Sequence, residues 1–300
     1  MLELLNGLPL MRLHFAFRAS APLSLLGYTG STWHGALGHA LSEAAPEAFD
    51  CLYRAAAGDD APRPFALLPH AGPTELAPGD WLGMSLTLAG PALALSREVM
   101  FAVEHLGARG LGNQHVPLTL SGVACERADG EAVAVLGPAG TMQAQGLVSV
   151  GLAELAAIWA GLPARRVALR FDTRLRMKAG NGLMDTAPPL RLLLQRLLER
   201  VSALMMLYGA GAPLPGDGVR ALLRHAESVE IETHDLLWEE WERSSGRSGQ
   251  RMPWGGLVGE IRYRGDLTPL LPWLALGEWL HVGAKTTFGL GHYSLLAAPR

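Results

Sequence analysis

The segment RVALRFDTRLRMK, at residues 166–178, alternates apolar and charged side chains along its length. This period of two predicts a long β-strand with one buried face and one charged face. The apolar face would hold Val167, Leu169, Phe171, Leu175 and Met177. The charged face would hold Arg166, Arg170, Arg174, Arg176 and Lys178, with Asp172 among them. Five cations on one face repel each other unless something anionic lies beside them.

The segments after this strand predict the order helix, two strands, helix, strand. Residues 188–208 are expected to form the clearest helix of the chain, because prolines occupy its first turn and leucines form an apolar stripe. Gly209 follows as a natural end. The other predicted elements are two strands flanking a Ser/Gly/Arg loop, a short helix and a final strand, at residues 229–241, 256–264, 267–279 and 290–296.

The first half of the chain predicts the same order of elements. Its expected strands and helices lie at residues 11–18, 31–41, 64–68, 81–89, 95–106 and 116–126. Ser31 and Thr32 are expected to cap the first helix. Two βαββαβ units predict an α+β protein with tandem ferredoxin-like (RRM-like) domains and a glycine-rich loop near the C-terminus. We place the domains at residues 1–161 and 162–300.

The composition excludes several classes of protein. Hydrophobic residues make up 49% of the 300 residues and charged residues 18%, which is enough apolar material for real cores. The two cysteines, Cys51 and Cys125, belong to no CxxC motif, which argues against a structural zinc site and fits a reducing compartment. No uncharged apolar run reaches the roughly 18 residues of a membrane span. We therefore expect a cytoplasmic protein with no membrane partner.

The charge of the chain is unevenly distributed. Residues 1–161 carry 7 basic and 14 acidic side chains, whereas residues 162–300 carry 18 basic and 14 acidic ones. Such asymmetry hints at a polyanionic partner for the second half. Compositional noise would explain it equally well.

The segment HVGAKTTFGLGH, at residues 281–292, has the composition of a phosphate-binding loop. Glycines let the backbone approach a ligand closely, and a lysine with two hydroxyls adds polar groups. The spacing is not that of a Walker loop, and the segment follows a helix instead of a strand. A tight helix-to-strand connection is the alternative interpretation. The candidate binding residues are Gly283, Lys285, Thr286, Thr287, Gly289 and Gly291.

Two further groups of basic residues are candidates for RNA contact. Phosphates would relieve the repulsion along the strand at 166–178, through Arg170, Arg174, Arg176 and Lys178. Acidic neighbours such as Glu230 or Glu232 are the alternative. The Ser/Gly/Arg loop, with Arg247 and Arg251, would enter a groove and order there, or would simply be a surface loop.

Histidines supply the candidates for proton transfer, because imidazole titrates near neutral pH. His34 and His39 both lie on the helix expected at 31–41. His39 lies about 200° around the helix from the buried Leu37, so it should face outward, and His34 should border the apolar side. Their spacing is not that of a metal-binding pair. Ordinary surface histidines are the alternative.

These stretches together resemble the CRISPR precursor-RNA (repeat) processing endoribonucleases of the RAMP superfamily, in the branch with a glycine-rich C-terminal domain. The resemblance covers nearly the whole chain and is most specific at the C-terminal glycine run. It rests on residues 30–41, 106–112, 169–178 with the helix to 209, 255–259 and 280–291. In one departure, His34 stands where that branch has an arginine.

The resemblance implies a metal-independent endoribonuclease without a cofactor. The 2′-OH of the RNA would attack the neighbouring phosphodiester, giving 2′,3′-cyclic phosphate and 5′-OH ends, and the enzyme would stay with the mature crRNA. We expect His39 or His34 as acid or base, Tyr53 or Tyr28 as a partner, and Lys285 as the phosphate-stabilising cation. The expected partners are a CRISPR repeat RNA that folds as a hairpin and other subunits of an effector complex. The alternative is a non-catalytic RAMP subunit that binds crRNA, and a more distant one is a small-molecule enzyme on this scaffold.

Overall fold

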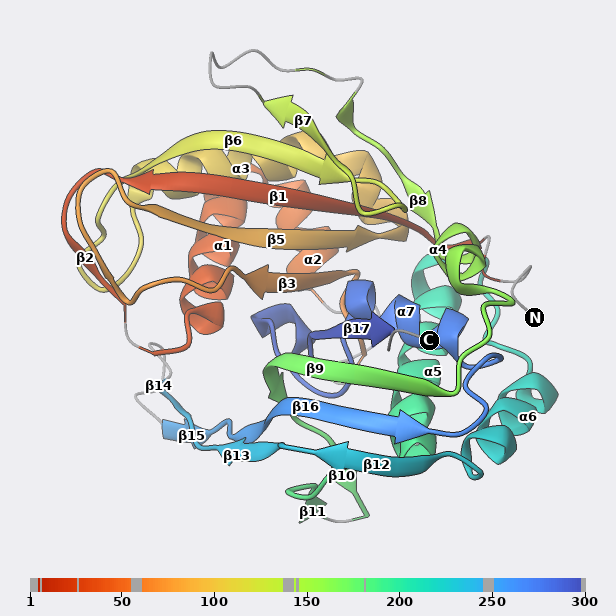
Figure 1. The fold of residues 1–300 in the computed structure, drawn as a ribbon. Coiled ribbons are helices and arrows are strands. Elements are labelled where there is room, and N and C mark those ends of the chain that lie inside the picture. Colours follow the sequence, from red (N-terminus) through yellow and green to blue (C-terminus); the bar gives the residue numbers. More distant parts are fainter. Residues whose placement is uncertain are drawn as a thin grey trace.

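The structure is a computed structural model in which two antiparallel sheets lie one above the other, with helices packed against them (Figure 1). It describes residues 5, 7–25, 27–54, 61–136, 143, 146–180, 182–244 and 251–297, and within this range the side chains of 242–244, 251–253 and 297 are left out. None of the described helices has the length and apolar character needed to cross a membrane.

The first sheet has the strand order β3-β5-β1-β6-β7, and β8 pairs with β1. Its strands are β1 (Pro9–Ala19), β3 (Phe65–Pro69), β5 (Trp81–Ala89), β6 (Leu118–Glu126), β7 (Ala132–Leu136) and β8 (Val150–Gly151). Its helices are α1 (Gly30–Ala44), α2 (Pro46–Tyr53), the 3-10 helix η2 (Gly90–Leu95) and α3 (Ser96–Arg109). A two-stranded ribbon joins β2 (Leu23–Ser24) and β4 (Glu75–Leu76).

The second sheet has the order β12-β16-β9-β17, and β13 pairs with β16. Its strands are β9 (Arg166–Leu175), β12 (Glu230–His234), β13 (Leu237–Glu239), β16 (Gly256–Arg264) and β17 (Tyr293–Ala297). Its helices are α4 (Leu152–Trp159), α5 (Leu190–Tyr208), α6 (Gly216–Ala226), α7 (Leu271–Leu280) and the 3-10 helix η4 (Thr286–Phe288). Two small ribbons pair β10 (Lys178–Ala179) with β11 (Gly182–Leu183), and β14 (Glu242–Ser244) with β15 (Arg251–Pro253).

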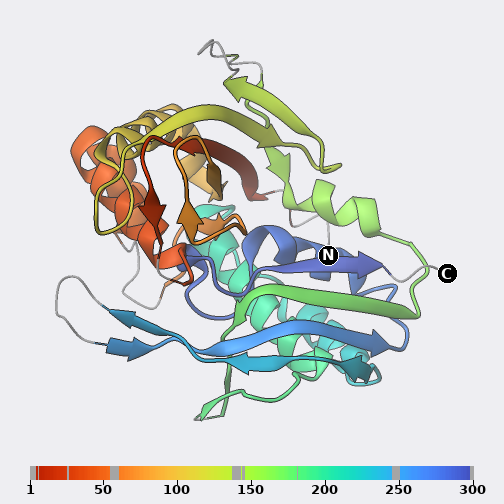
Figure 2. The same ribbon diagram turned by 60° about the vertical axis from the view of Figure 1, so that its left-hand side comes forward.

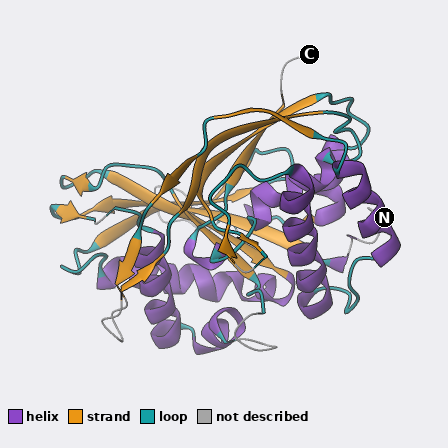
Figure 3. Ribbon diagram, turned by 90° about the horizontal axis from the view of Figure 1, so that it is seen from below, coloured by secondary structure: helices purple, strands orange, loops and turns teal. Residues whose placement is uncertain are grey.

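The strand orders of the two sheets confirm the predicted tandem ferredoxin-like fold. In each unit the first strand lies between the third and the fourth, and the second strand lies beyond the third. Seen from below, the helices gather along the right and lower sides of the strands (Figure 3). The second core also includes Leu8, Leu10 and Val150 from the first half of the chain. The domain boundary near residue 161 stays a prediction.

Three local predictions were wrong. The single strand expected at residues 229–241 is divided into β12 and β13, which both pair with β16. The first helix begins at Gly30, so Ser31 and Thr32 lie inside it, and the N-cap residue Thr29 makes no side-chain cap hydrogen bond. At this start the helix packs closely against the glycine-rich loop, because a Cβ on Gly30 would lie 2.0 Å from the carbonyl oxygen of Phe288. The long strand ends at residue 175 instead of 178, since the next backbone carbonyl bonds the glycine-rich loop.

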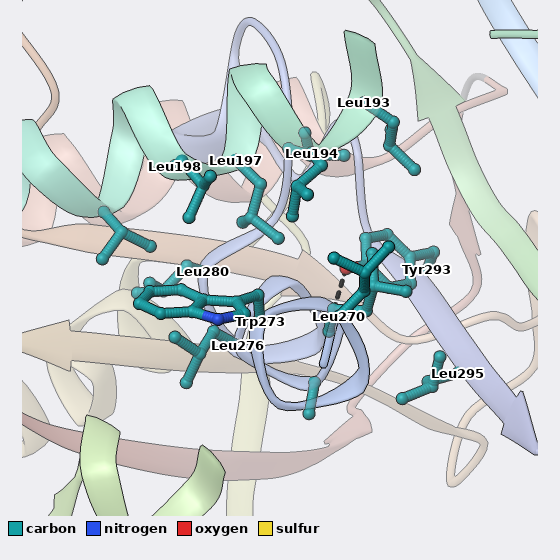
Figure 4. Packing of buried hydrophobic residues seen from close by; sticks show 14 of the residues in the cluster. Leu193, Leu194, Leu197, Leu198, Leu270, Trp273, Leu276, Leu280, Tyr293 and Leu295 are labelled. Atoms are coloured by element: carbon teal, nitrogen blue, oxygen red, sulfur yellow. Dashed lines mark hydrogen bonds between the residues drawn. The ribbon is translucent and has the colours of Figure 1, made fainter. Parts of the chain in front are cut away.

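The apolar stripe of α5 was predicted correctly and builds the core beneath the second sheet. Leu194, Leu197 and Leu198 point toward α7, which carries Trp273, Leu276 and Leu280, and Leu193 lies nearer Tyr293 (Figure 4). Sequence patterns missed α2, α4 and α6, which are short helices of 8 to 11 residues. Short helices contribute too few turns for their periodicity to stand out.

Buried polar contacts hold the two halves together. Arg12 of β1 donates to the carbonyl oxygen of Glu278 at 2.6 Å, and its guanidinium lies 4.2 Å from the centre of the Trp279 ring. On the α5 side, the Tyr208 hydroxyl donates to the carbonyl oxygen of Pro62 at 3.0 Å. These contacts fix the space between the first and second halves, where the candidate site lies.

Candidate active-site cleft

A cleft of about 990 Å³ opens between the two halves of the molecule. Helix α1, strand β3, helix α5 and the glycine-rich loop all contribute to its wall. Basic side chains far outnumber acidic ones among the lining residues, where Glu199 is the one carboxylate of the described part. The lining cations are Arg63, Arg176, Lys178, Arg196, Arg200 and Lys285. The excess of positive charge along its wall therefore suits the cleft to a polyanion.

His34 is the histidine of the cleft. Its Nδ1 lies 2.9 Å from the carbonyl oxygen of Thr287. Because a carbonyl oxygen only accepts hydrogen bonds, Nδ1 carries the proton, and the lone pair of the neutral ring lies on Nε2. The ring stacks on Phe288, with the centroids 3.7 Å apart. The glycine-rich loop thus fixes both the tautomer and the orientation of this imidazole.

Tyr53 holds His34 from the other side. Its hydroxyl donates to the backbone carbonyl oxygen of His34 at 2.7 Å, and the two ring centroids are 4.8 Å apart. Burial raises the pKa of Tyr53 well above the ordinary tyrosine value. Tyr28 is similar, because burial raises its pKa and its hydroxyl donates to the carbonyl oxygen of Phe288 at 3.1 Å. Both phenols are suited to positioning the site, and neither to releasing a proton.

His39 lies apart from the cleft. Its side chain is exposed on α1, as the helical periodicity predicts, and it is not among the cleft-lining residues of the described chain. Five residues of helix rotate its ring well away from that of His34. The structure therefore brings His34, Tyr53 and Lys285 to one cleft and leaves His39 outside it.

The glycine-rich loop is both a helix-to-strand connection and a wall of the cleft. It joins α7 to β17, and its short helix η4 contacts α1 and β3. Gly283 has a φ of +86°, and a Cβ there would lie 2.5 Å from the carbonyl oxygen of Arg176, so a side chain would force the two segments apart. Gly289 and Gly291 also have positive φ angles.

The side chains of this loop differ in exposure. Lys285 is exposed and adopts a left-handed backbone conformation, with φ +64° and ψ +33°, which costs a non-glycine residue about 1 kcal/mol or more. Its Nζ lies 5.6 Å from the centre of the Trp254 ring. Thr286 is buried and Thr287 is half-buried. The loop therefore presents an exposed ammonium group to the cleft that His34 also lines.

The predicted face of five cations does not form. Arg166 pairs with Glu232 at 2.7 Å and Arg170 with Asp172 at 2.9 Å. These ion pairs are of the kind that the alternative interpretation of the sequence expects, and contact of Arg170 with RNA stays a prediction.

The remaining cations of the segment at residues 166–178 are one paired arginine on β9 and two residues that line the cleft. Arg174 is only 6% exposed and pairs with Glu239 at 3.0 Å. Arg176 and Lys178, which follow the end of β9, line the cleft. The Arg176 guanidinium also donates to the carbonyl oxygen of Gly255 at 2.8 Å.

The Ser/Gly/Arg loop connects β14 and β15, which form a hairpin that projects beyond the second sheet (Figure 2). Arg247 lies outside the described residues. Arg251 belongs to β15, but its side chain is not described. Contact of this loop with RNA stays a prediction.

Three cleft arginines were missed by sequence reasoning. Arg196 and Arg200 lie one turn apart on α5, and this i,i+4 pair of like charges was a readable signal. Arg63 lies in the irregular segment before β3, where no periodicity marks it. Burial lowers the pKa of Arg200 to about 10, and its Nε donates to the carbonyl oxygen of Leu280 at 2.7 Å.

A second polar cluster lies on the first sheet, away from the residues that line the cleft. The Ser85 hydroxyl lies 2.7 Å from a ring nitrogen of both His14 and His70, and Glu126 lies 2.8 Å from the other nitrogen of His14. Burial lowers the pKa of His70 to about 4. Within the described ranges, no group of three or more His, Cys, Asp or Glu side chains is arranged to hold a metal ion.

Comparison with known proteins matches both halves of the chain. A family model described as the CRISPR-associated endoribonuclease Cas6 matches residues 169–293, and a model described as an N-terminal domain matches residues 8–146. No curated protein matches the sequence.

Solved structures show the same fold. Thermus thermophilus Cas6 is 19% identical, with a TM-score of 0.63 over 97% of this chain and 99% of that one. A product complex of the same Thermus protein is 20% identical, with a TM-score of 0.63 over 96% and 100% of the two chains. A chain of a partial Cas6-RT-Cas1–Cas2 complex is 17% identical, with a TM-score of 0.67 over 98% of this chain and 47% of that one.

Proposed function

We propose that this chain, whose residues 169–293 match the Cas6 family model, acts as a Cas6 endoribonuclease and cuts the repeat RNA of a precursor transcript in the cleft between its two sheets. The observation that carries the proposal is the lining of this cleft. Among the described lining residues, an oriented imidazole, that of His34, shares the cleft with six cationic side chains and one carboxylate. An RNA backbone supplies the negative charge that such a surface lacks.

The proposed reaction is an internal transesterification. The 2′-OH loses its proton to a base, O2′ attacks the adjacent phosphorus, and the bond from phosphorus to O5′ breaks. O5′ takes up a proton, and the products carry a 2′,3′-cyclic phosphate and a 5′-OH. The reaction needs a base, a proton donor and a cation for the charge that builds up on the phosphorane oxygens.

The described side chains divide these roles. His34 acts as the base through Nε2, since its Nδ1 proton is committed to the carbonyl oxygen of Thr287. Lys285 stabilises the phosphorane, and its ammonium group or a water molecule protonates O5′. Tyr53 positions the His34 backbone and ring. We prefer His34 over His39, because only His34 lines the cleft among the described residues.

Retention of the product is part of the proposal. Cleavage at one phosphodiester leaves the other phosphates of the repeat intact, so most of the charge contacts of Arg176 and Lys178 would survive the reaction. The Thermus relative was solved as a product complex. We expect the cleaved repeat RNA to dissociate slowly, as crRNA that is handed on within a complex must.

The test uses a synthetic RNA of one repeat from a CRISPR array of the source genome. Cleavage in EDTA that yields a 2′,3′-cyclic phosphate is the expected result. A 2′-deoxy substitution at the scissile nucleotide should abolish cleavage and preserve binding. Complete loss of cleavage in EDTA would contradict the metal-independent mechanism. Binding without any cleavage of the all-ribose RNA would favour a non-catalytic role.

A further inference from the structure

The α5 side of the cleft contains three arginines that the proposed reaction does not use. Arg196 and Arg200 come from α5, and Arg63 comes from the segment before β3 in the other half of the molecule. The Tyr208 hydroxyl lies between these segments, because it donates to the carbonyl oxygen of Pro62 and interacts with the charges of both Arg63 and Arg200. Cations from two halves of the chain thus converge beside one phenol.

The hydrogen bonding of these arginines is incomplete in the described part of the chain. The Nη1 atom of Arg63 and the Nε atom of Arg196 are buried, yet neither has a hydrogen-bond partner among the described residues. Buried guanidinium nitrogens are nearly always paired, so two unpaired ones in the same cleft call for an acceptor.

The positive charge of the corner formed by Arg63, Arg196 and Arg200 is also only partly neutralised. Glu199 accepts from Arg196 at 2.8 Å and is the one carboxylate among the described lining residues. Arg200 donates to a backbone carbonyl oxygen, which leaves its charge in place. Like charges one helical turn apart destabilise each other unless an anion lies between or beside them. An oxyanion would supply both the missing acceptors and the missing charge.

A continuous wall links this corner to the proposed reaction centre. Arg196 donates to the carbonyl oxygen of Lys178 at 3.1 Å, and the amide of Ala284 donates to the carbonyl oxygen of Arg176 at 2.9 Å. The path from Arg196 to Lys285 therefore runs along cationic residues of the same cleft. An RNA strand bound along this path would pass Arg196, Lys178, Arg176 and Lys285.

We propose that Arg63, Arg196 and Arg200 form a second phosphate subsite, which binds a non-scissile phosphodiester of the RNA strand. The inference rests on the proposed function and deepens it, because anchoring one phosphate here fixes which phosphodiester reaches His34. Arginine suits this task, since its planar fork binds two phosphate oxygens at once. The subsite would set the register of the cut.

The experiment couples a protein change to the removal of one charge from the RNA. Wild type, Arg196→Gln and Arg63→Gln each bind a set of repeat RNAs that carry a 2′-deoxy group at the scissile nucleotide and one neutral methylphosphonate at successive positions. Arg97→Gln, at an exposed position of α3, is the matched control. Thermal melting verifies that each variant is folded, and the two test variants alter residues from different halves of the molecule.

We expect both variants to weaken binding and to lower the slope of log K against log salt by about 0.7, which corresponds to one phosphate contact on a single strand. The methylphosphonate at one non-scissile position should weaken binding by wild type and by Arg97→Gln, but have little further effect on either variant. Cleavage of the all-ribose RNA by the variants should become less accurate in position.

The subsite would be overturned if the losses of affinity from the substitution and from the methylphosphonate were additive at every RNA position. Wild-type affinity in both variants would overturn it as well. Binding of inorganic phosphate at this corner without positional coupling to the RNA would also overturn it, because the site would then serve a free anion. These outcomes leave binding and cleavage by the wild type intact. A wild type that binds no repeat RNA would instead reject the proposed function, and the subsite with it.

Discussion

Arginines of β9 and arginines of the cleft differ in their partners, although all but Arg63 of the cleft arginines come from the same half of the molecule as β9. Arg166, Arg170 and Arg174 each pair with a carboxylate within 3.0 Å. Across the cleft, six cationic side chains share one carboxylate among the described residues. The density of basic residues along a segment therefore says little about its ligand, and the pairing of each charge says much more.

The difference arises from what lies beside each group. The β9 arginines have acidic neighbours on the same sheet, such as Glu232 of β12 and Glu239 of β13. The cleft cations share their cleft with the glycine-rich loop and α1, and the loop has no acidic residue between 281 and 292. If this comparison is correct, substitutions in the cleft will weaken the binding or cleavage of RNA, and substitutions on β9 will lower the stability of the folded protein.

The largest expected effect comes from His34→Ala. Removing the proposed base should slow cleavage by roughly 10²–10⁴-fold, with RNA affinity within a few-fold of wild type. The measurement is the single-turnover cleavage rate at saturating protein. His39→Ala, a change on the exposed face of the same helix, should cleave like wild type. The opposite pattern, with His39 essential and His34 dispensable, would reject the assignment.

Lys285→Ala is expected to rank second. Loss of the cation at the phosphorane should slow the single-turnover rate by roughly 10²–10³-fold. Alanine at this position keeps an L-residue in the left-handed conformation, so the backbone strain of the loop is unchanged. The other lysine of the chain provides the control, because Lys178→Ala should weaken binding and leave the saturated rate intact. Equal effects of both changes on the rate would contradict these roles.

Binding to RNA offers the direct contrast between the two regions. Arg176→Gln, in the cleft, should lower the salt slope of repeat-RNA binding by about 0.7, whereas Arg170→Gln, in an ion pair on β9, should leave it unchanged. Fluorescence anisotropy over a series of salt concentrations measures both slopes. If Arg170→Gln gave the larger loss, the β9 face would be the RNA surface and the comparison would be reversed.

Asp172 gives the smallest expected effect. Burial raises its pKa, but interactions with His292, Ser294 and Arg170 outweigh this and hold the pKa at about 2, below the ordinary value of 3.8. The ionised form is therefore favoured by folding, and its stabilisation is present above about pH 3.8 and lost as the pH falls toward 2. The side chain is 34% exposed, so solvent screening limits the effect to about 1 kcal/mol.

The measurement is urea unfolding of Asp172→Asn beside wild type at pH 6 and near pH 2. The variant should be less stable at pH 6, and the difference should shrink at the lower pH. RNA affinity should stay unchanged. A difference in stability that is the same at both pH values would show that the ionised carboxylate contributes nothing.

Most of the fold followed from the sequence, and less of the site did. Periodicity located β5 and β16 with their correct bounds, because both strands alternate or are buried along their whole length. The outward direction of His39 was also predictable from helix geometry. Periodicity cannot indicate which outward face meets a cleft, since this depends on how the halves pack. The packing of α1 against the glycine-rich loop selected His34.

The remaining gaps have the same physical origin. Whether Arg166 and Arg174 are neutralised depends on strands β12 and β13, which lie more than sixty residues away along the chain. Arg63 enters the cleft from an irregular segment without periodicity. Long-range neighbours decide both cases, and a single sequence does not specify them.

The most direct test is a crystal structure of the protein with a repeat RNA that carries a 2′-deoxy group at the scissile nucleotide. We expect the scissile phosphate between His34 and Lys285, with the strand continuing past Arg176 along the cleft. An RNA that lies across the paired arginines of β9, with the cleft empty, would contradict the central claim that the uncompensated cations of the cleft bind the RNA backbone.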